Sequence, residues 1–135
     1  MQEQKPLVDL ASILAEHVDC DYTKRVPIGL KELDPDGVKH IIANATKPVV
    51  IKFGKDFCGW TKKLNRVLQV LVPRYADRAE FYEVNIPSYP QVRDEYALDT
   101  SPMMLLFKDG NEVDRSDAAE AHEVPPVFER WFGRV

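Results

Sequence analysis

The residues of this chain best suited to chemistry are its two cysteines, Cys20 and Cys58. Two cysteines are too few for the disulfide framework of a small secreted protein and too few for a four-cysteine zinc site. The three histidines, His17, His40 and His122, are scattered without the spacing of metal ligands. We therefore expect no metal centre and no cofactor, and the chemistry to consider is that of a thiol.

Cys58 lies between an apolar run typical of a buried strand, residues 48–54, and the helical pattern that follows it. A thiol at the start of a helix meets the positive end of the helix dipole and unpaired backbone N–H groups, and both favour the thiolate. Because the thiolate is the species that attacks a disulfide, Cys58 is the candidate nucleophile. The alternative is that Cys58 is a small buried hydrophobic residue.

Cys20 lies in a polar stretch, residues 19–25. It is a possible resolving thiol for Cys58, provided that the fold brings the two Cα atoms within about 7 Å. A free surface thiol is the simpler interpretation, and the sequence leaves both open.

The composition narrows the classes of function. The 135 residues fit one domain, and 44% hydrophobic with 30% charged residues is an ordinary globular balance. A net charge of −4 argues against partners such as nucleic acid or an anionic membrane. No apolar run approaches the roughly 20 residues that cross a bilayer. Acidic residues interrupt residues 1–18, which is untypical of a secretory signal, so we expect a cytoplasmic protein.

Hydrophobic spacing predicts the elements that must position Cys58. Helical spacing predicts helices over residues 7–18, 34–45, a stretch after Cys58, weakly 89–97, and a last helix from Pro125 to Gly133. Strands are expected over residues 26–33, 48–54, 80–86, 103–107 and 112–115. In the helix after Cys58, we expect Lys62, Lys63 and Arg66 to face solvent and Pro73 to end or kink the helix.

Helix-linked buried strands imply parallel pairing, and the tight Asp109–Gly110 turn implies an antiparallel pair at one edge. The fold class expected is α/β, with a central mixed sheet of four or five strands and helices on both faces.

Three runs of sequence resemble the thioredoxin family. They are KPVVIKFGKDFCGWTKKLNRVL, FYEVNIPSYPQVRDEYAL and TSPMMLLFKDGNEV, and they occur in the family's order. The resemblance covers about residues 28–132 and implies the three-layer α/β/α thioredoxin fold. We therefore expect a thioredoxin-like domain over residues 26–135, preceded by an N-terminal extension, residues 1–25, with a short amphipathic helix.

The resemblance makes Cys58 the nucleophile and puts Thr61 where the family has its resolving cysteine. A hydroxyl cannot expel a substrate from a mixed disulfide. Thr61 either donates a hydrogen bond to the Cys58 thiolate or is a first-turn residue with no chemical task.

Lys52 occupies the position of the family's buried aspartate, and Glu83 stands where bacterial members carry a lysine. Because a buried lysine needs a partner, we predict a partly buried Lys52–Glu83 ion pair. A cation at this place would stabilise the thiolate but could not accept a proton as a carboxylate does.

Pro102, preceded by Ser101, matches the family's cis-proline, whose loop faces the nucleophile and binds an extended substrate. With Gly59 and Trp60 these residues form the expected substrate-binding set. We expect Trp60 to be an exposed contact residue, although packing on Phe57 is the alternative.

The motif Cys-Gly-Trp-Thr also resembles the Cys-Gly-Phe-Ser motif of monothiol glutaredoxins, which use glutathione as the second thiol. The hairpin run and the absence of a glycine pair after it favour the thioredoxin resemblance.

Two functions of different class follow. The first is a monothiol thiol–disulfide oxidoreductase that reacts through Cys58 with protein thiols or disulfides, or with glutathione. The second is a non-catalytic thioredoxin-like module that binds proteins or acts as a chaperone.

Overall fold

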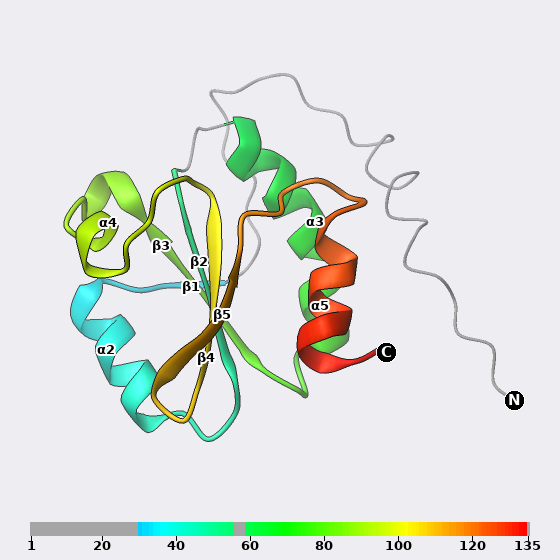
Figure 1. Cartoon of the computed structure of the whole chain (residues 1–135), viewed down its shortest axis with the longest axis horizontal. Coiled ribbons are helices and arrows are strands. Elements are labelled where there is room, and N and C mark those ends of the chain that lie inside the picture. The colour runs from blue at the N-terminus through cyan, green and yellow to red at the C-terminus, as the bar shows by residue number, and fades with distance from the viewer. Residues whose placement is uncertain (1–29, 56–58, 135) are drawn as a thin grey trace, which may run out of the picture.

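The computed structural model describes residues 30–55 and 59–134, which form a five-stranded mixed sheet between two layers of helices (Figure 1). The strands are β1 (Lys31–Glu32), β2 (Val49–Gly54), β3 (Glu80–Asn85), β4 (Met103–Lys108) and β5 (Asn111–Ser116). The helices are α2 (Pro35–Asn44), α3 (Gly59–Tyr75), the short η2 (Ile86–Ser88), α4 (Val92–Glu95) and α5 (Val124–Phe132). In Figure 1, α2 and α4 lie on one face of the sheet, and α3 and α5 lie on the other.

The strand order is β1-β3-β2-β4-β5. β3 is parallel to both β1 and β2, whereas β4 is antiparallel to β2 and to β5. The hairpin between β4 and β5 turns at Asp109 and Gly110, whose φ angles of 52° and 84° are those of a tight turn that matches the strand twist. The expected α/β class, with its mixed sheet and helices on both faces, is confirmed.

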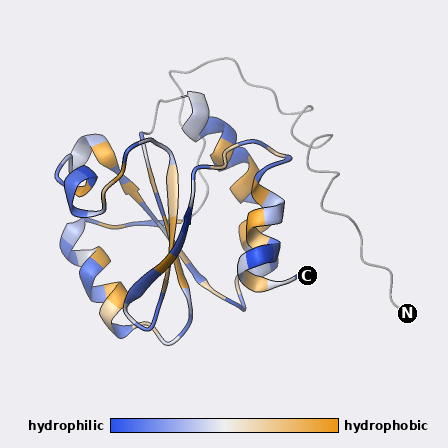
Figure 2. Cartoon of the chain, viewed as in Figure 1, coloured by the Kyte–Doolittle hydropathy of each residue, from blue (hydrophilic) through white to orange (hydrophobic). Residues whose placement is uncertain are grey.

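Each face of the sheet has its own apolar core, and the apolar stripes of the helices turn toward the strands (Figure 2). On the α3 and α5 side, Val50, Leu68 and Phe128 are buried together. On the α2 and α4 side, Ile51 and Val92 belong to a second cluster. Successive β2 residues point to opposite faces, so the continuous apolar run of β2 is explained by burial on both sides.

Two helix ends follow local signals in the sequence. Asp34 caps α2 by accepting a hydrogen bond from the Gly37 N–H at 2.6 Å, with Pro35 opening the helix. α5 stops at Gly133, whose φ of 81° suits glycine. These ends match the residues expected from the sequence.

Two expectations differ from the structure, and three others lie outside the described residues. α3 continues through Pro73 to Tyr75, because a proline this close to the end removes little of the hydrogen-bond ladder. The edge strand β1 comprises only Lys31 and Glu32. The predicted helix over residues 7–18, the domain boundary near residue 25, and Cys20 fall outside the described residues and stay predictions.

None of the helices in the described part of the chain has the length and apolar character that crossing a membrane requires.

Candidate functional site

Three elements meet where β2 ends, α3 begins and β4 starts. A Cβ added to Gly54, the last residue of β2, would lie 3.0 Å from Oγ1 and 3.2 Å from Cγ2 of Thr61, and 3.5 Å from Cβ of Pro102. Glycine at position 54 therefore lets the first turn of α3 and the loop before β4 approach the strand closely. The Ser101–Pro102 peptide bond is cis, as the resemblance implied, and Pro102 is buried.

Thr61 is fully buried at this junction. Its Oγ1 accepts a hydrogen bond from the Lys55 N–H at 3.3 Å, which ties the residue after β2 to the first turn of α3. A hydroxyl that accepts one bond still has its own hydrogen to donate. Thr61 is therefore a buried polar group with one donor available at the start of α3.

Cys58, with Asp56 and Phe57, lies outside the described residues, but both flanks of the segment are described. Lys55 is exposed on one side, and Gly59 is half-buried on the other. Of the residues expected at the site, the structure brings Thr61 and Pro102 together beside this segment. Their chemical roles stay predictions.

Lys52 and Glu83 form the ion pair expected from the sequence. They are neighbours in register on β2 and β3, and Lys52 Nζ lies 3.0 Å from Glu83 Oε1. The pair is buried rather than partly buried, since the residues are only 2% and 8% exposed. Removing either partner alone would destabilise the protein, because the remaining charge would be buried without a partner.

Asn65 completes this polar group and was missed by the sequence reasoning. Its Oδ1 accepts a second hydrogen bond from Lys52 Nζ at 2.9 Å, and the residue is only 4% exposed. Asn65 follows Thr61 by one helical turn, on the face that buries Leu68. A polar residue on the apolar face of a helix is the signal that could have revealed it.

Lys62 corrects another expectation. It was predicted to face solvent with Lys63, but it is buried, with 2% exposure. The long aliphatic stem of a lysine can lie along apolar surface while its ammonium group keeps polar contacts. In its first turns, α3 also buries residues beyond its apolar stripe, among them Thr61 and Lys62.

Trp60 is exposed, as expected, with 52% of its surface accessible. The ammonium group of Lys63 lies 4.5 Å from the centroid of its ring and 3.4 Å from Oε1 of Glu120. This contact is a cation–π interaction, and with the ion pair it links the start of α3 to the loop before α5. Trp60 therefore presents an exposed aromatic ring, contacted by Lys63, two residues after Cys58 in the sequence.

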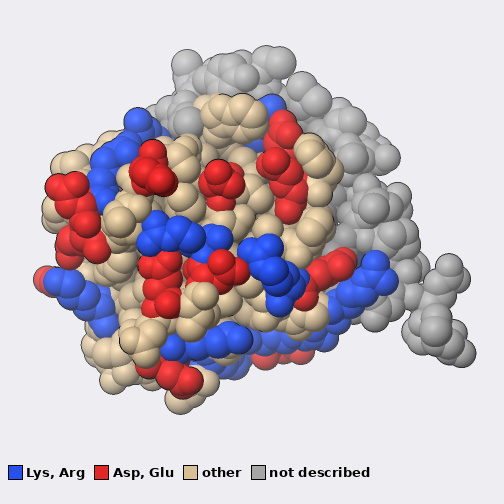
Figure 3. All heavy atoms as spheres, viewed as in Figure 1, with Lys and Arg blue, Asp and Glu red and all other residues tan. Residues whose placement is uncertain are grey.

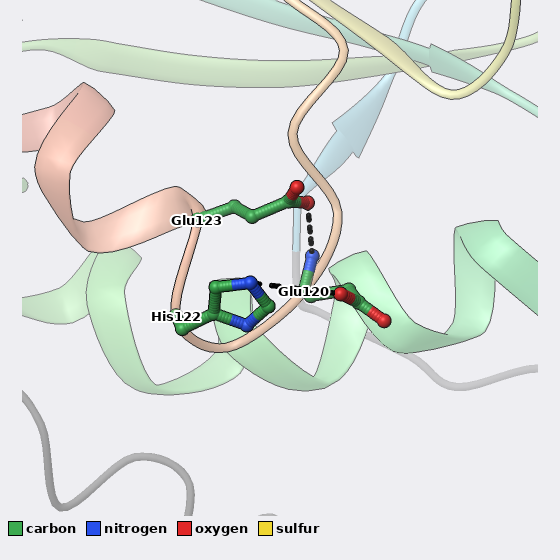
Figure 4. Close-up of side chains that lie close together, drawn as sticks. All are labelled: Glu120, His122 and Glu123. Atoms are coloured by element: carbon green, nitrogen blue, oxygen red, sulfur yellow. Dashed lines mark hydrogen bonds and ion pairs between the residues drawn. The ribbon is translucent and has the colours of Figure 1, made fainter.

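Glu120, His122 and Glu123 lie close together in the loop before α5, with possible ligand atoms within 4.8 Å of one another (Figure 4). Their carboxylates already have protein partners. Glu123 Oε1 accepts from the N–H groups of Ala119 and Glu120, both at 3.3 Å, and Glu120 pairs with Lys63. The contacts of this cluster brace the loop and connect it to α3.

Comparison with known proteins gives the family. Residues 29–124 match the family model described as Thioredoxin. The chain is 30% identical over 96 residues to thioredoxin M3, chloroplastic, of Oryza sativa subsp. japonica, which covers 71% of this chain and 53% of the relative. It is also 30% identical over 73 residues to monothiol glutaredoxin-S17 of Arabidopsis thaliana, covering 54% of this chain and 15% of that protein.

The fold is likewise that of solved thioredoxins. The crystal structure of Chlamydomonas reinhardtii thioredoxin f2 superposes with a TM-score of 0.71 at 22% identity, over 79% of this chain and all of that one. The chain spans about half the length of the rice relative. With its five-stranded mixed sheet, its Gly54–Thr61–Pro102 junction and its match over residues 29–124, the chain belongs to the thioredoxin family.

Proposed function

We propose that this protein carries out thiol–disulfide exchange with a single thiol, Cys58. The Cys58 thiolate attacks a disulfide R–S–S–R′, forms the mixed disulfide Cys58–S–S–R and releases R′–S⁻. An external thiolate then attacks the sulfur of R, which frees Cys58 as a thiolate. Membership of the thioredoxin family supports exchange chemistry, and threonine at position 61, in place of the family's second cysteine, supports the single-thiol form.

The observation that carries the proposal is the setting of Thr61. Its hydroxyl accepts from the Lys55 N–H and retains one hydrogen for a neighbouring acceptor. A thiolate at position 58 is such an acceptor, three residues before Thr61 on the entry to α3. In this proposal Thr61 stabilises the Cys58 thiolate, and release depends on a thiol from outside the motif.

Lys52 is the second tuning residue in the proposal. Its side-chain nitrogen is buried and held between Glu83 and Asn65, where the family's buried aspartate would stand. In this proposal Thr61 stands in place of the family's second cysteine and Lys52 in place of its buried aspartate, so the dithiol route lacks both groups at their usual positions. The single-thiol cycle requires neither.

The remaining residues of the predicted site would bind substrate. Pro102 and Ser101 form the loop beside Thr61, and Gly59 with Trp60 forms the start of α3. The partners proposed are protein thiols or disulfides, with glutathione as a candidate external thiol. A cytoplasmic location stays a prediction.

A second function, a non-catalytic binding module, is favoured by one observation. Trp60 is a large exposed aromatic that Lys63 holds in place, and interfaces are enriched in such residues. In that function Cys58 would have an ordinary thiol pKa.

The rate of alkylation by iodoacetamide against pH separates the two functions. The measurement uses Cys20→Ser, so that Cys58 is the reacting thiol, with the Cys20→Ser/Cys58→Ser double variant as the blank. We expect an apparent pKa below the free-thiol value of about 8.5. A value at or above that of a free thiol would reject the exchange function and leave the binding module.

A further inference from the structure

Arg115 of β5 joins the edge of the sheet to the end of α4. Its Nη1 donates to the carbonyl oxygen of Ala97 and its Nη2 to that of Tyr96, both at 2.9 Å. Nε and Nη2 also donate to the two carboxylate oxygens of Glu112, at 2.6 and 2.8 Å. The carboxylate fixes one edge of the planar guanidinium group, so the other edge is held toward the two carbonyls.

The two carbonyls belong to the turn that leads from α4 into the loop before β4, residues 98–102. α4 ends at Glu95, and Ala97 has a φ angle of 51°, in the left-handed region that a residue with a Cβ seldom adopts. Basic side chains are known to bond to the last carbonyls of a helix in this way. Because the chain changes direction at Ala97, the bonds from Arg115 fix the course of the loop that follows.

β5 holds the other end of the same loop. Met104 pairs in register with Ser116, the residue after Arg115, and Leu105 pairs with Arg115 itself. Successive residues of one strand therefore hold both ends of the loop over residues 98–102. Arg115 holds its start through a side chain, and the β4–β5 backbone ladder holds its end.

The loop needs this support because one of its sides is not packed. It borders an open groove of about 600 Å³, whose wall includes Asp99 and Thr100 of the loop and Arg115 of β5. Asp99 and Thr100 are both exposed. The hydrogen bonds to Glu112 are the largest cause that raises the pKa of Arg115, and the charge of Asp99 raises it further, so Arg115 stays charged beside the loop.

Arg130 of α5 lines the same groove but makes different contacts. Its Nε and Nη2 donate to Oδ2 of Asp114, and among residues 30–55 and 59–134 its hydrogen bonds go to this carboxylate alone. Figure 3 shows acidic and basic side chains interleaved over the face that carries β5. Charge pairs are therefore ordinary on this face, and the bonds to the carbonyls of another element distinguish Arg115.

We propose that Arg115 is a positioning residue of the exchange site, which holds the loop over residues 98–102 so that the Ser101 backbone is presented to an extended substrate. The proposal rests on the exchange function above, because that function takes the loop with Pro102 as the place where substrate binds. A substrate that lies along this loop then depends on Arg115. A disulfide too small to reach the loop depends only on the Cys58 thiolate.

The test compares two disulfides that release the same chromogenic thiol. One is dipyridyl disulfide, and the other is an extended peptide of uncharged residues whose one cysteine carries a thiopyridyl group. In the Cys20→Ser protein, the parent here, Cys58 attacks the peptide sulfur, forms a mixed disulfide with the peptide and releases the thiopyridyl group. We expect Arg115→Gln to slow the single-turnover reaction with the peptide about tenfold and that with dipyridyl disulfide less than about twofold.

Arg130→Gln is the matched control. It removes the same charge and a carboxylate pair from the same groove but leaves the end of α4 untouched, so both rates should stay close to those of the parent. Arg115→Lys keeps the charge, and it decides the question if Arg115→Gln fails to fold. Because one ammonium group cannot replace the fork that bonds Glu112 and both carbonyls, the peptide should still react severalfold more slowly.

Three outcomes would overturn the proposal. The first is an equal loss of rate for both disulfides in the Arg115 variants. The second is a peptide-specific loss of the same size in Arg130→Gln. The third is an unchanged peptide rate in Arg115→Lys.

A binding measurement separates this proposal from the exchange function. The same peptide, with serine in place of cysteine and a fluorophore attached, is titrated with each protein and followed by anisotropy. If neither disulfide reacts faster with the parent than with Cys20→Ser/Cys58→Ser, the exchange function fails. The role of Arg115 still holds in that case if the parent binds the peptide and Arg115→Lys binds it more weakly while Arg130→Gln does not. Equal affinities, or no binding by the parent, reject it.

Discussion

At the scale of single residues, Thr61 is the position on which the proposed single-thiol chemistry depends most. A hydroxyl there occupies the space beside Gly54 and Pro102 and bonds to the Lys55 N–H. The same place holds a donor that can stabilise a neighbouring thiolate but has no sulfur to displace a substrate. The residue is therefore the most direct point at which to test the proposed chemistry.

Replacing Thr61 by Val keeps the shape of the side chain and removes the hydroxyl. We expect alkylation of Cys58 at neutral pH to slow about tenfold, since a lost hydrogen bond to the thiolate raises the pKa of the thiol. Thr61→Ser keeps the hydroxyl and should retain most of the rate. Equal rates for the Val and Ser variants would mean that the hydroxyl does not act on Cys58.

The buried Lys52–Glu83 pair gives the second prediction at this scale. Lys52→Met leaves the Glu83 carboxylate buried without its partner and should lower the free energy of unfolding by about 3–5 kcal/mol. Lys52→Met/Glu83→Leu removes both charges and should recover much of that loss. Urea unfolding of the parent and the variants measures the effect, and a double variant no more stable than Lys52→Met would show that the pairing is not what holds the lysine there.

At the scale of elements, the close approach at Gly54 decides how β2, α3 and β4 meet. A Cβ at this position would lie 3.0 Å from the Thr61 hydroxyl, a contact so tight that the buried Thr61 side chain must shift by a few tenths of an ångström. We expect Gly54→Ala to destabilise the fold by about 1–3 kcal/mol, as overpacking of a tight core does. The measurement is denaturant unfolding, and an unchanged midpoint would mean that the junction accommodates the added methyl group without loss of stability.

Asp114 joins two other elements, the edge strand β5 and α5. Its Oδ2 accepts from the Trp131 Nε1–H at 2.8 Å and from Arg130, and its Oδ1 accepts from the Arg115 N–H at 2.8 Å. The bond from Trp131 is the largest cause that lowers the pKa of the Asp114 carboxyl below its ordinary value, and burial opposes it. The charged form is thus the one that the folded state favours.

The pH dependence of stability follows from that direction. Because the pKa is lower in the folded state, Asp114 contributes stability above its unfolded value of about 3.8, and this contribution disappears as the pH falls through the folded pKa. The parent should therefore lose thermal stability on acidification more steeply than Asp114→Asn. Superimposable slopes of melting temperature against pH for the two proteins would contradict this.

At the scale of the whole molecule, the sequence predicted what local signals determine. Asp34–Pro35, Asp109–Gly110 and Gly133 are helix or turn signals that act within a few residues, and the structure has them where they were expected. The Lys52–Glu83 pair was predictable because two buried strands each carried one misplaced charge. The turn and cap signals need no knowledge of how distant segments pack, whereas the pair also required the family resemblance, which makes the two strands neighbours.

The features that could not be predicted depend on distant packing. Lys62 and Asn65 are polar residues whose burial is decided by what covers the first turns of α3. Arg115 on β5 likewise reaches the carbonyl oxygens of Tyr96 and Ala97, and Arg130 on α5 reaches Asp114 on β5, contacts that join segments distant in the sequence. Hydrophobic spacing along the chain contains neither kind of information.

The two cysteines give a prediction for the whole chain. Mild oxidation with glutathione disulfide should add glutathione to Cys58, with loss of the adduct in Cys58→Ser. Intact mass spectrometry of the non-reduced protein checks this. A mass lower by two hydrogens, with no adduct, would instead mean that Cys20 and Cys58 join and that the protein supplies its own second thiol.

The bond from the Arg115 amide to Asp114 has a consequence for how the protein behaves at high concentration. β5 is an outer strand, and an outer strand with open amides invites another chain to add to the sheet, which is a common start of aggregation. Here the Asp114 carboxylate already covers one of those amides, and the opposite outer strand has only two residues. Strand-by-strand growth of fibrils from this fold is therefore discouraged at both ends of the sheet.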